Sequence, residues 1–156
     1  LDFPAASMSP VAVDPCVCEA LGAAASEAVI AADNPHSVVY GFEFERDVGA
    51  LKPDFSALLA TSELSVIVTA PGDECDFVSR FFGHQVGIDE DPVTGSAHCS
   101  LVPYWADRLG RDTLQARQIS SRGGALACSL REGRVYMTGL AITYMQGQVN
   151  AAGIAS

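Results

Sequence analysis

Hydrophobic and polar positions alternate over short distances through most of the chain. Such runs, bounded by Gly, Pro, Asn and Asp, are typical of β-strands. We predict strands at residues 1–3, 28–31, 37–44, 65–69, 77–82, 114–120, 125–130, 134–137 and 141–145. The turn residues Asp33-Asn34-Pro35 indicate that the second and third of these form a hairpin.

Three segments have the signals of helices instead. Asp14-Pro15 opens a short helix that ends at Gly22, and Pro53-Asp54 opens a second one through Leu59. Residues 94–110 form the third, which is apolar on nearly every side and therefore belongs inside the protein. It contains Pro103, which should bend it, and is followed by Gly110 as a C-cap.

These elements predict an α+β fold in which a curved, mostly antiparallel sheet or barrel wraps around one buried central helix. At 156 residues, 49% of them hydrophobic, the chain can bury one sizeable core. No internal repeat or linker divides it, so residues 1–156 are predicted to be a single domain.

Charge and cysteine content narrow the classes of function. Nineteen acidic residues against nine basic ones give a net charge of −10, which disfavours nucleic acids and anionic membrane surfaces as partners. No apolar run approaches the roughly 20 residues of a membrane helix and no cationic leader opens the chain, so we expect a cytoplasmic protein. The five cysteines are odd in number and lack a Cys-x-x-Cys spacing. We therefore expect free, mostly buried thiols and no metal site.

The chemistry is concentrated in residues 87–98, Gly-Ile-Asp-Glu-Asp-Pro-Val-Thr-Gly-Ser-Ala-His. The first amides of a helix lack acceptors within the helix and lie at the positive end of its dipole, so they suit a carboxylate or phosphate. Gly95 permits close approach of the backbone, Thr94 or Ser96 can add a hydroxyl, and Asp91 precedes the anion site. A simpler interpretation is that Asp91 or Thr94 only caps the helix.

The same residues resemble the PhzF-like (phenazine biosynthesis-like) family, a branch of the diaminopimelate-epimerase-like superfamily, in which Glu-Asp-Pro-Val-Thr-Gly-Ser-Ala-His marks the C-terminal half. The likeness covers almost the entire chain. Its other matching segments are Leu1-Asp2-Phe3-Pro4-Ala5, Pro53-Asp54-Phe55, Asp76-Phe77-Val78-Ser79-Arg80-Phe81-Phe82, Pro103-Tyr104-Trp105, Arg108-Leu109-Gly110, Gln118-Ile119-Ser120 and Arg122-Gly123-Gly124.

The resemblance implies two similar lobes, each a sheet barrel around a central helix, with the substrate in the cleft between them. Family members isomerise or epimerise small carboxylic acids without cofactors by general acid–base catalysis. On this basis Asp91 and Ser96 are the catalytic candidates, and Thr94, Gly95, Ala97 and His98 the substrate-binding candidates. The family's catalytic glutamate lies in the N-terminal lobe and has no counterpart here. Superfamily members that use two cysteines place one at this helix start, where this chain has Ser96.

Several other residues have predicted places in the fold. His98 is more readily a hydrogen-bonded core histidine than a ligand contact, and Arg80 should pair with the acidic motif. Tyr104 and Trp105, and the phenylalanines at 77, 81 and 82, are expected in the core. Arg122, beside two glycines, can serve a turn or an anion.

Three hypotheses of function follow. The first is a cofactor-independent isomerase or epimerase, or one half of it, acting on a small carboxylic acid. The second is a catalytically silent binding or interaction module. The third is a fragment whose N-terminal lobe is a separate polypeptide. An isolated lobe should expose the face that a second lobe covers in the family. We therefore expect either a homodimer that brings two Asp91 side chains to one cleft, or a complex with a separate N-terminal lobe.

Overall fold

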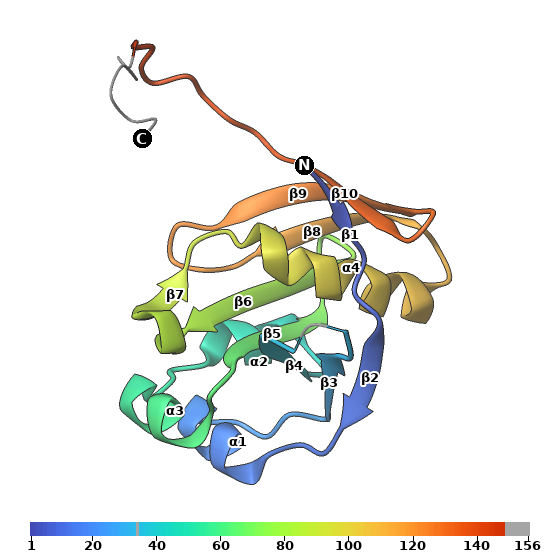
Figure 1. Cartoon of the computed structure of the whole chain (residues 1–156). Coiled ribbons are helices and arrows are strands. Elements are labelled where there is room, and N and C mark those ends of the chain that lie inside the picture. The colour runs from blue at the N-terminus through green and yellow to red at the C-terminus, as the bar shows by residue number, and fades with distance from the viewer. Residues whose placement is uncertain (34, 149–156) are drawn as a thin grey trace, which may run out of the picture.

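A single mixed sheet organises the protein in the computed structural model, which describes residues 1–33 and 35–148. The sheet has ten strands in this part of the chain: nine follow the order β1-β10-β9-β8-β6-β5-β4-β3-β2, and β7 pairs with β6 outside this path (Figure 1). The strands are β1 (Asp2–Pro4), β2 (Met8–Val11), β3 (Glu27–Ala31), β4 (Ser37–Gly41), β5 (Ser65–Pro71), β6 (Phe77–Gly83), β7 (Ile88–Asp91), β8 (Thr113–Gln118), β9 (Gly124–Arg131) and β10 (Arg134–Thr138). The helices are α1 (Pro15–Leu21), α2 (Glu45–Ala50), α3 (Phe55–Thr61), the 3-10 turn η1 (His84–Val86) and α4 (Gly95–Leu109).

The first strands of the chain bring the two ends of the sheet together. β1 and β2 stand at opposite ends of the strand order although they follow each other in sequence. Between them, the Ala6 N–H donates to the Cys99 carbonyl of α4 at 3.0 Å, and the Ala5 N–H donates to the Gly133 carbonyl at 2.9 Å. The N-terminal segment therefore crosses α4 and links both edges of the sheet to it.

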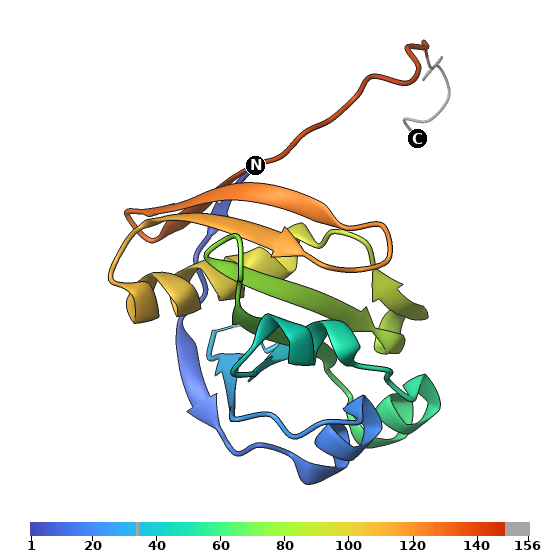
Figure 2. The same cartoon turned by 180° about the vertical axis from the view of Figure 1, so that it is seen from behind.

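Each face of the sheet has its own core. The α4 side is filled by residues such as Leu101 and Trp105, and the Trp105 ring stacks on Phe77 with centroids 5.7 Å apart. The opposite face is covered by α1, α2 and α3, as a comparison of Figures 1 and 2 shows. In β5, Ile67 points to α4 while its neighbours Val66 and Val68 point to the other core. This double burial explains the continuous apolar run of β5.

Most of the predicted elements are present, and the predicted fold class is confirmed. α1 has Asp14 as its N-cap, with the Cys16 N–H donating to the carboxylate, and Gly22 as its C-cap with φ 78°. α4 contains Pro103 and ends at Gly110, with φ 64°. Strands β3 and β4 pair antiparallel, as the hairpin prediction requires; Asn34 of the turn lies outside the described residues.

Some predictions were wrong or incomplete. Residues 141–145 form no strand; their large side chains are exposed. The prediction missed β2, which contains Pro10, the acidic strand β7, and α2. All five cysteines are free, as expected, but only Cys128 is buried. None of the helices in the described residues is both long and apolar enough to cross a membrane.

Candidate active site

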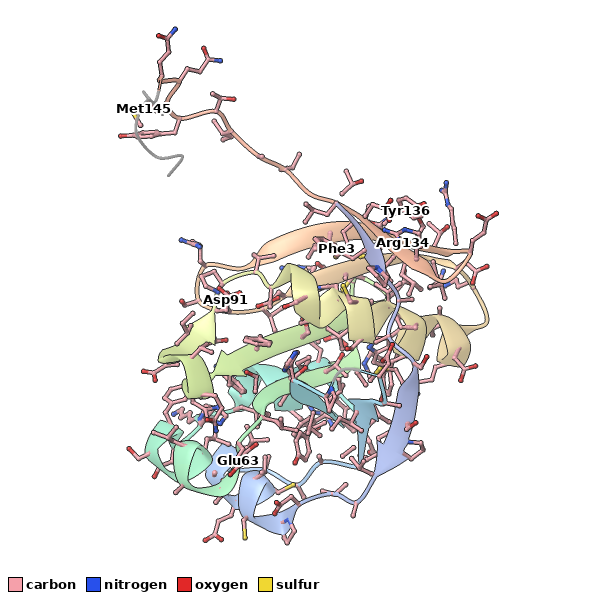
Figure 3. All side chains as sticks on the ribbon, viewed as in Figure 1. Phe3, Glu63, Asp91, Arg134, Tyr136 and Met145 are labelled. Atoms are coloured by element: carbon pink, nitrogen blue, oxygen red, sulfur yellow. The ribbon has the colours of Figure 1, made fainter. Side chains whose placement is uncertain are left out.

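The turn between β7 and α4 holds the predicted acidic group. Asp91 is the last residue of β7, and Thr94 is the N-cap of α4 with an extended backbone, φ −110° and ψ 105°. The Thr94 hydroxyl donates to Asp91 Oδ2 at 2.5 Å, and the Thr94 side chain makes no capping bond to the helix. Figure 3 shows Asp91 at the end of β7, beside the start of α4. Neither side chain acts as a simple helix cap.

The start of α4 has open hydrogen-bond donors. In the described part of the chain, the N–H groups of Gly95, Ser96 and Ala97 have no acceptor. These groups carry the positive end of the dipole of a helix that spans Gly95–Leu109. The arrangement can accept a carboxylate or a developing oxyanion.

Gln118 on β8 holds this turn in place from inside the protein. Its Oε1 accepts from the Thr94 N–H at 2.8 Å, and its Nε2 donates to the Asp91 carbonyl at 2.7 Å and to Thr94 Oγ1 at 3.1 Å. The Gln118 side chain is almost fully buried, at 1% exposure. A buried amide with partners on both of its ends fixes the relative position of Asp91 and the helix start.

Two further contacts hold the segment around the turn. Arg80 of β6 donates to both oxygens of Glu90, at 2.7 and 3.0 Å, and also to the carbonyls of Val48 and Leu51. The prediction that Arg80 pairs with the acidic motif is therefore confirmed. In addition, the Ser120 hydroxyl donates to the Pro92 carbonyl at 2.8 Å.

Two cavities flank the helix start. One, of about 350 Å³, is lined by Ser96 and Cys99 together with Phe3 and Phe81. The other, of about 720 Å³, is lined by Gly95, Val93 and the loop residues Gly123 and Gly124. Ser96 and Gly95 thus line different cavities.

The remaining site candidates lie deeper. Ala97 and His98 are buried, with 3% and 0% exposure. His98 Nδ1 donates to the Thr94 carbonyl at 2.8 Å, whereas its Nε2 is buried without a partner in the described residues. Burial lowers the pKa of the His98 imidazole, so the ring is held neutral. Thr94 and Asp91 line neither of the two cavities. Thr94 directly precedes Gly95, whose N–H is the first of the amides without an acceptor. The assigned roles of all six site residues stay predictions.

Thiol chemistry has little support at this helix start. Cys99 lies one turn inside α4, with its Sγ 3.8 Å from the Gly95 carbonyl. Burial raises the pKa of the Cys99 thiol, which keeps it in the less nucleophilic protonated form. Among the described residues, no group of three His, Cys, Asp or Glu side chains is arranged to hold a metal ion.

The sequence prediction missed Gln118 and Ser120 as residues that shape the site. One signal was present: β8 alternates between exposed and buried positions, and Gln118 follows Leu114 and Ala116 on its buried face. A polar residue at a buried position of such an alternation needs internal partners. Nothing local in the sequence identifies those partners as the Asp91–Thr94 turn.

The fold and this site define a lobe of the diaminopimelate-epimerase type, in which the start of a buried helix faces an acidic turn. The family model "Phenazine biosynthesis-like protein" matches residues 13–147, and the chain belongs to this family. Two uncharacterized isomerases of Pseudomonas aeruginosa are each 46% identical to it, over 150 and 149 residues. Each comparison covers 96% of this chain and 56% of the relative.

Solved structures agree. A PhzF family phenazine biosynthesis protein of Enterococcus faecalis has a TM-score of 0.81 and 42% identity, covering 90% of this chain and 55% of that one. A putative phenazine biosynthesis PhzC/PhzF protein of Clostridium difficile has a TM-score of 0.83 and 32% identity, covering 96% and 57%. The chain therefore spans little more than half the length of the relatives it matches.

Proposed function

We propose that this lobe binds a small carboxylic acid at the start of α4 and supplies one half of a cofactor-independent isomerase or epimerase. The observation that supports the proposal is the group of open amides at Gly95, Ser96 and Ala97, next to an Asp91 whose position is fixed by Gln118. The named isomerases of Pseudomonas aeruginosa, at 46% identity, support the class of reaction.

In this proposal the groups of the site have different tasks. The amides and the Ser96 hydroxyl hold the substrate carboxylate and stabilise the negative charge that develops on it when a neighbouring C–H bond loses its proton. Asp91 Oδ2 is occupied by the Thr94 hydroxyl, whereas Oδ1 has no hydrogen-bond partner in the described residues and takes up or returns the proton. A second lobe supplies the opposite acid or base, and a second copy of this chain would supply another Asp91.

Solvent deuterium exchange tests this proposal directly. The protein is incubated in D₂O with a panel of small carboxylic acids that carry an acidic C–H bond next to the carboxylate or conjugated with it. We expect deuterium to enter at least one acid, and Asp91→Asn to reduce the rate by about 10²–10⁴-fold, because proton transfer loses its acceptor. The matched change Asp89→Asn removes an exposed carboxylate of the same strand and should leave the rate unaltered.

A silent binding module is the second candidate, because the chain covers only 56% of its isomerase relatives and the rest of their length would have to supply the opposite acid or base. Binding without exchange identifies it. In that case the amide NMR signals of Gly95–Ala97 shift with an added acid while no deuterium enters any member of the panel, and the isomerase proposal is wrong. Exchange that begins only when a separately produced N-terminal lobe is added supports the third hypothesis.

A further inference from the structure

Two polar atoms in the core beneath α4 have no hydrogen-bond partner among the described residues. They are the hydroxyl oxygen of Ser79, a residue that is 1% exposed, and Nε2 of His98, which is 0% exposed. A buried polar atom without a partner costs free energy, so native proteins satisfy nearly all such atoms with protein groups or with ordered water. The hydrogen bonds that hold the acidic turn use neither atom.

On the sheet, Ser79 stands in the middle of a row of three polar side chains. It pairs with Thr69 of β5 on one side and with Gln118 of β8 on the other. Side chains of residues paired across neighbouring strands point to the same face of a sheet. Phe77, two positions before Ser79 on β6, belongs to the core on the α4 side. The whole row therefore faces α4.

The two outer members of this row already bind the helix. The Trp105 indole N–H of α4 donates to the Thr69 hydroxyl at 2.9 Å. At the other end, Gln118 Oε1 accepts from the Thr94 N–H at 2.8 Å. The helix thus crosses the row from β8 to β5, and β6 lies between these two contacts.

His98 occupies the corresponding middle position on the helix. It comes one turn after Thr94 and two turns before Trp105, so the three side chains lie on the same side of α4. Its ring also lies beside Phe77, with the ring centroids 6.0 Å apart. His98 is therefore directed at the part of β6 that carries Ser79.

The two atoms are complementary as donor and acceptor. A carbonyl oxygen only accepts, so Nδ1 of His98, 2.8 Å from the Thr94 carbonyl, carries the ring proton. Nε2 of the neutral ring is then an acceptor, whereas the Ser79 hydroxyl has a proton to donate. The two groups make no direct hydrogen bond. One water molecule can accept from the first group and donate to the second.

We propose that a single buried water molecule joins Ser79 to His98, accepting from the Ser79 hydroxyl and donating to Nε2. The row then attaches α4 to three neighbouring strands, β5, β6 and β8. Three such contacts fix the height of the helix above the sheet and its rotation about its own axis, and so the direction of the open amides at its start. Ser79 and His98 are thus positioning residues. The water site rests on the proposed function only in this last consequence.

A double-mutant cycle in urea unfolding tests the link between the two side chains. Ser79→Ala and His98→Leu each leave the other group short of a partner, whereas the double change removes both groups. The double change should therefore raise the equilibrium constant of unfolding by about tenfold less than the product of the two single effects. The bond from Nδ1 to Thr94 is lost wherever His98 is replaced, so it cancels in the cycle.

The control cycle combines His98→Leu with Ser65→Ala. Ser65 lies on β5, on the same face as Ile67 and Thr69, but at the other end of the strand from the row. Its effect should multiply with that of His98→Leu without coupling. A Ser79–His98 cycle that is as additive as this control overturns the inference.

Two measurements on the unaltered protein locate the water directly. A crystal structure that shows ordered water should place one oxygen within about 3.2 Å of both the Ser79 hydroxyl and His98 Nε2. Nitrogen-15 NMR should show a neutral His98 with its proton on Nδ1, and the Nε2 signal should change in Ser79→Ala to that of a nitrogen that accepts no hydrogen bond. A direct bond between the two side chains, an unoccupied position between them, or a proton on Nε2 overturns the water site.

The consequence for the helix start is measured separately. The amide signals of Gly95–Ala97 should shift in Ser79→Ala, because α4 loses its attachment to β6; unchanged signals contradict the positioning role. None of these measurements needs a substrate. A coupled pair with its water in place, in a protein that exchanges no deuterium into any acid, supports this inference and contradicts the proposed function. Exchange in a protein whose cycle is additive does the opposite.

Discussion

Replacing Gln118 by leucine removes the side chain that joins the acidic turn to the start of α4. Leucine has nearly the same volume, so the β8 backbone and the surrounding core should stay in place. Two backbone groups lose their partner: the buried Thr94 N–H, now 2.8 Å from Gln118 Oε1, and the partly buried Asp91 carbonyl, now 2.7 Å from Gln118 Nε2. The Thr94 hydroxyl keeps its bond to Asp91 Oδ2.

The expected loss of stability follows from these two groups. An unsatisfied buried donor or acceptor costs about 1–3 kcal/mol, and the greater apolar burial of leucine offsets part of that cost. We therefore expect the free energy of unfolding to fall by about 3 kcal/mol. For a protein of this size that corresponds to a decrease of about 6–12 °C in Tm. The turn should also lose its fixed geometry, which would lower any Asp91-dependent exchange rate by about 10²-fold.

Urea and thermal unfolding of Gln118→Leu measure this effect, with Gln115→Leu as the matched control. Gln115 lies on the same strand, three positions earlier, and is exposed, so the identical substitution should change stability by less than about 0.5 kcal/mol. If the two variants unfold with equal free energies, the bonds of Gln118 do not hold the turn, and the geometry of Asp91 must be fixed by other contacts.

Two further predictions concern the groups around the turn. Arg80→Leu should destabilise the protein by about 2–4 kcal/mol in urea unfolding, because the half-buried Glu90 is left unpaired. The control Arg46→Leu removes an exposed ion pair with Asp47 and should cost less than about 0.5 kcal/mol. Equal losses for the two variants would contradict a structural role for the buried pair. Burial depresses the pKa of His98 below its usual 6.5, so below that pH the unfolded chain binds a proton that the folded chain does not. The contribution of neutral His98 to the free energy of unfolding should therefore be fully present above about pH 6.5 and decrease below it by at most about 1.4 kcal/mol per pH unit. In urea unfolding at several pH values, His98→Asn should reduce this dependence, whereas His36→Asn, at an exposed histidine, should not.

The sequence was sufficient to predict the central helix and the acidic turn because their signals are local. A segment that is apolar on nearly every side, preceded by Asp91 and Thr94 and followed by Gly110, specifies a buried helix with known ends. The Arg80–Glu90 pair was predictable for a related reason. A cation between apolar neighbours must find an anion, and the segment that follows along the chain offers three successive carboxylates.

The missed and mistaken elements depend on contacts distant in sequence. β7 carries three acidic residues and has no strand pattern of its own, yet it forms because β6 beside it offers an open edge. Conversely, residues 141–145 have a strand pattern but find no neighbour within the lobe. Strand formation requires a partner, so a local pattern predicts the capacity to pair and not the pairing itself.

The parts of the candidate site also differ in whether contacts within this lobe are enough to position them. Arg80 lies on β6 and Gln118 on β8, two strands that pair with each other and contribute to the core under α4. The geometry of Asp91 and of the open amides is therefore fixed by the folding of one lobe. In the proposed function, a second lobe would add the opposite wall and, with it, a second proton donor or acceptor. Under the proposed function, the lobe should therefore bind a carboxylate as a monomer, whereas deuterium exchange should require a second lobe. A monomeric lobe that exchanges deuterium into an acid would show that one lobe holds a complete site.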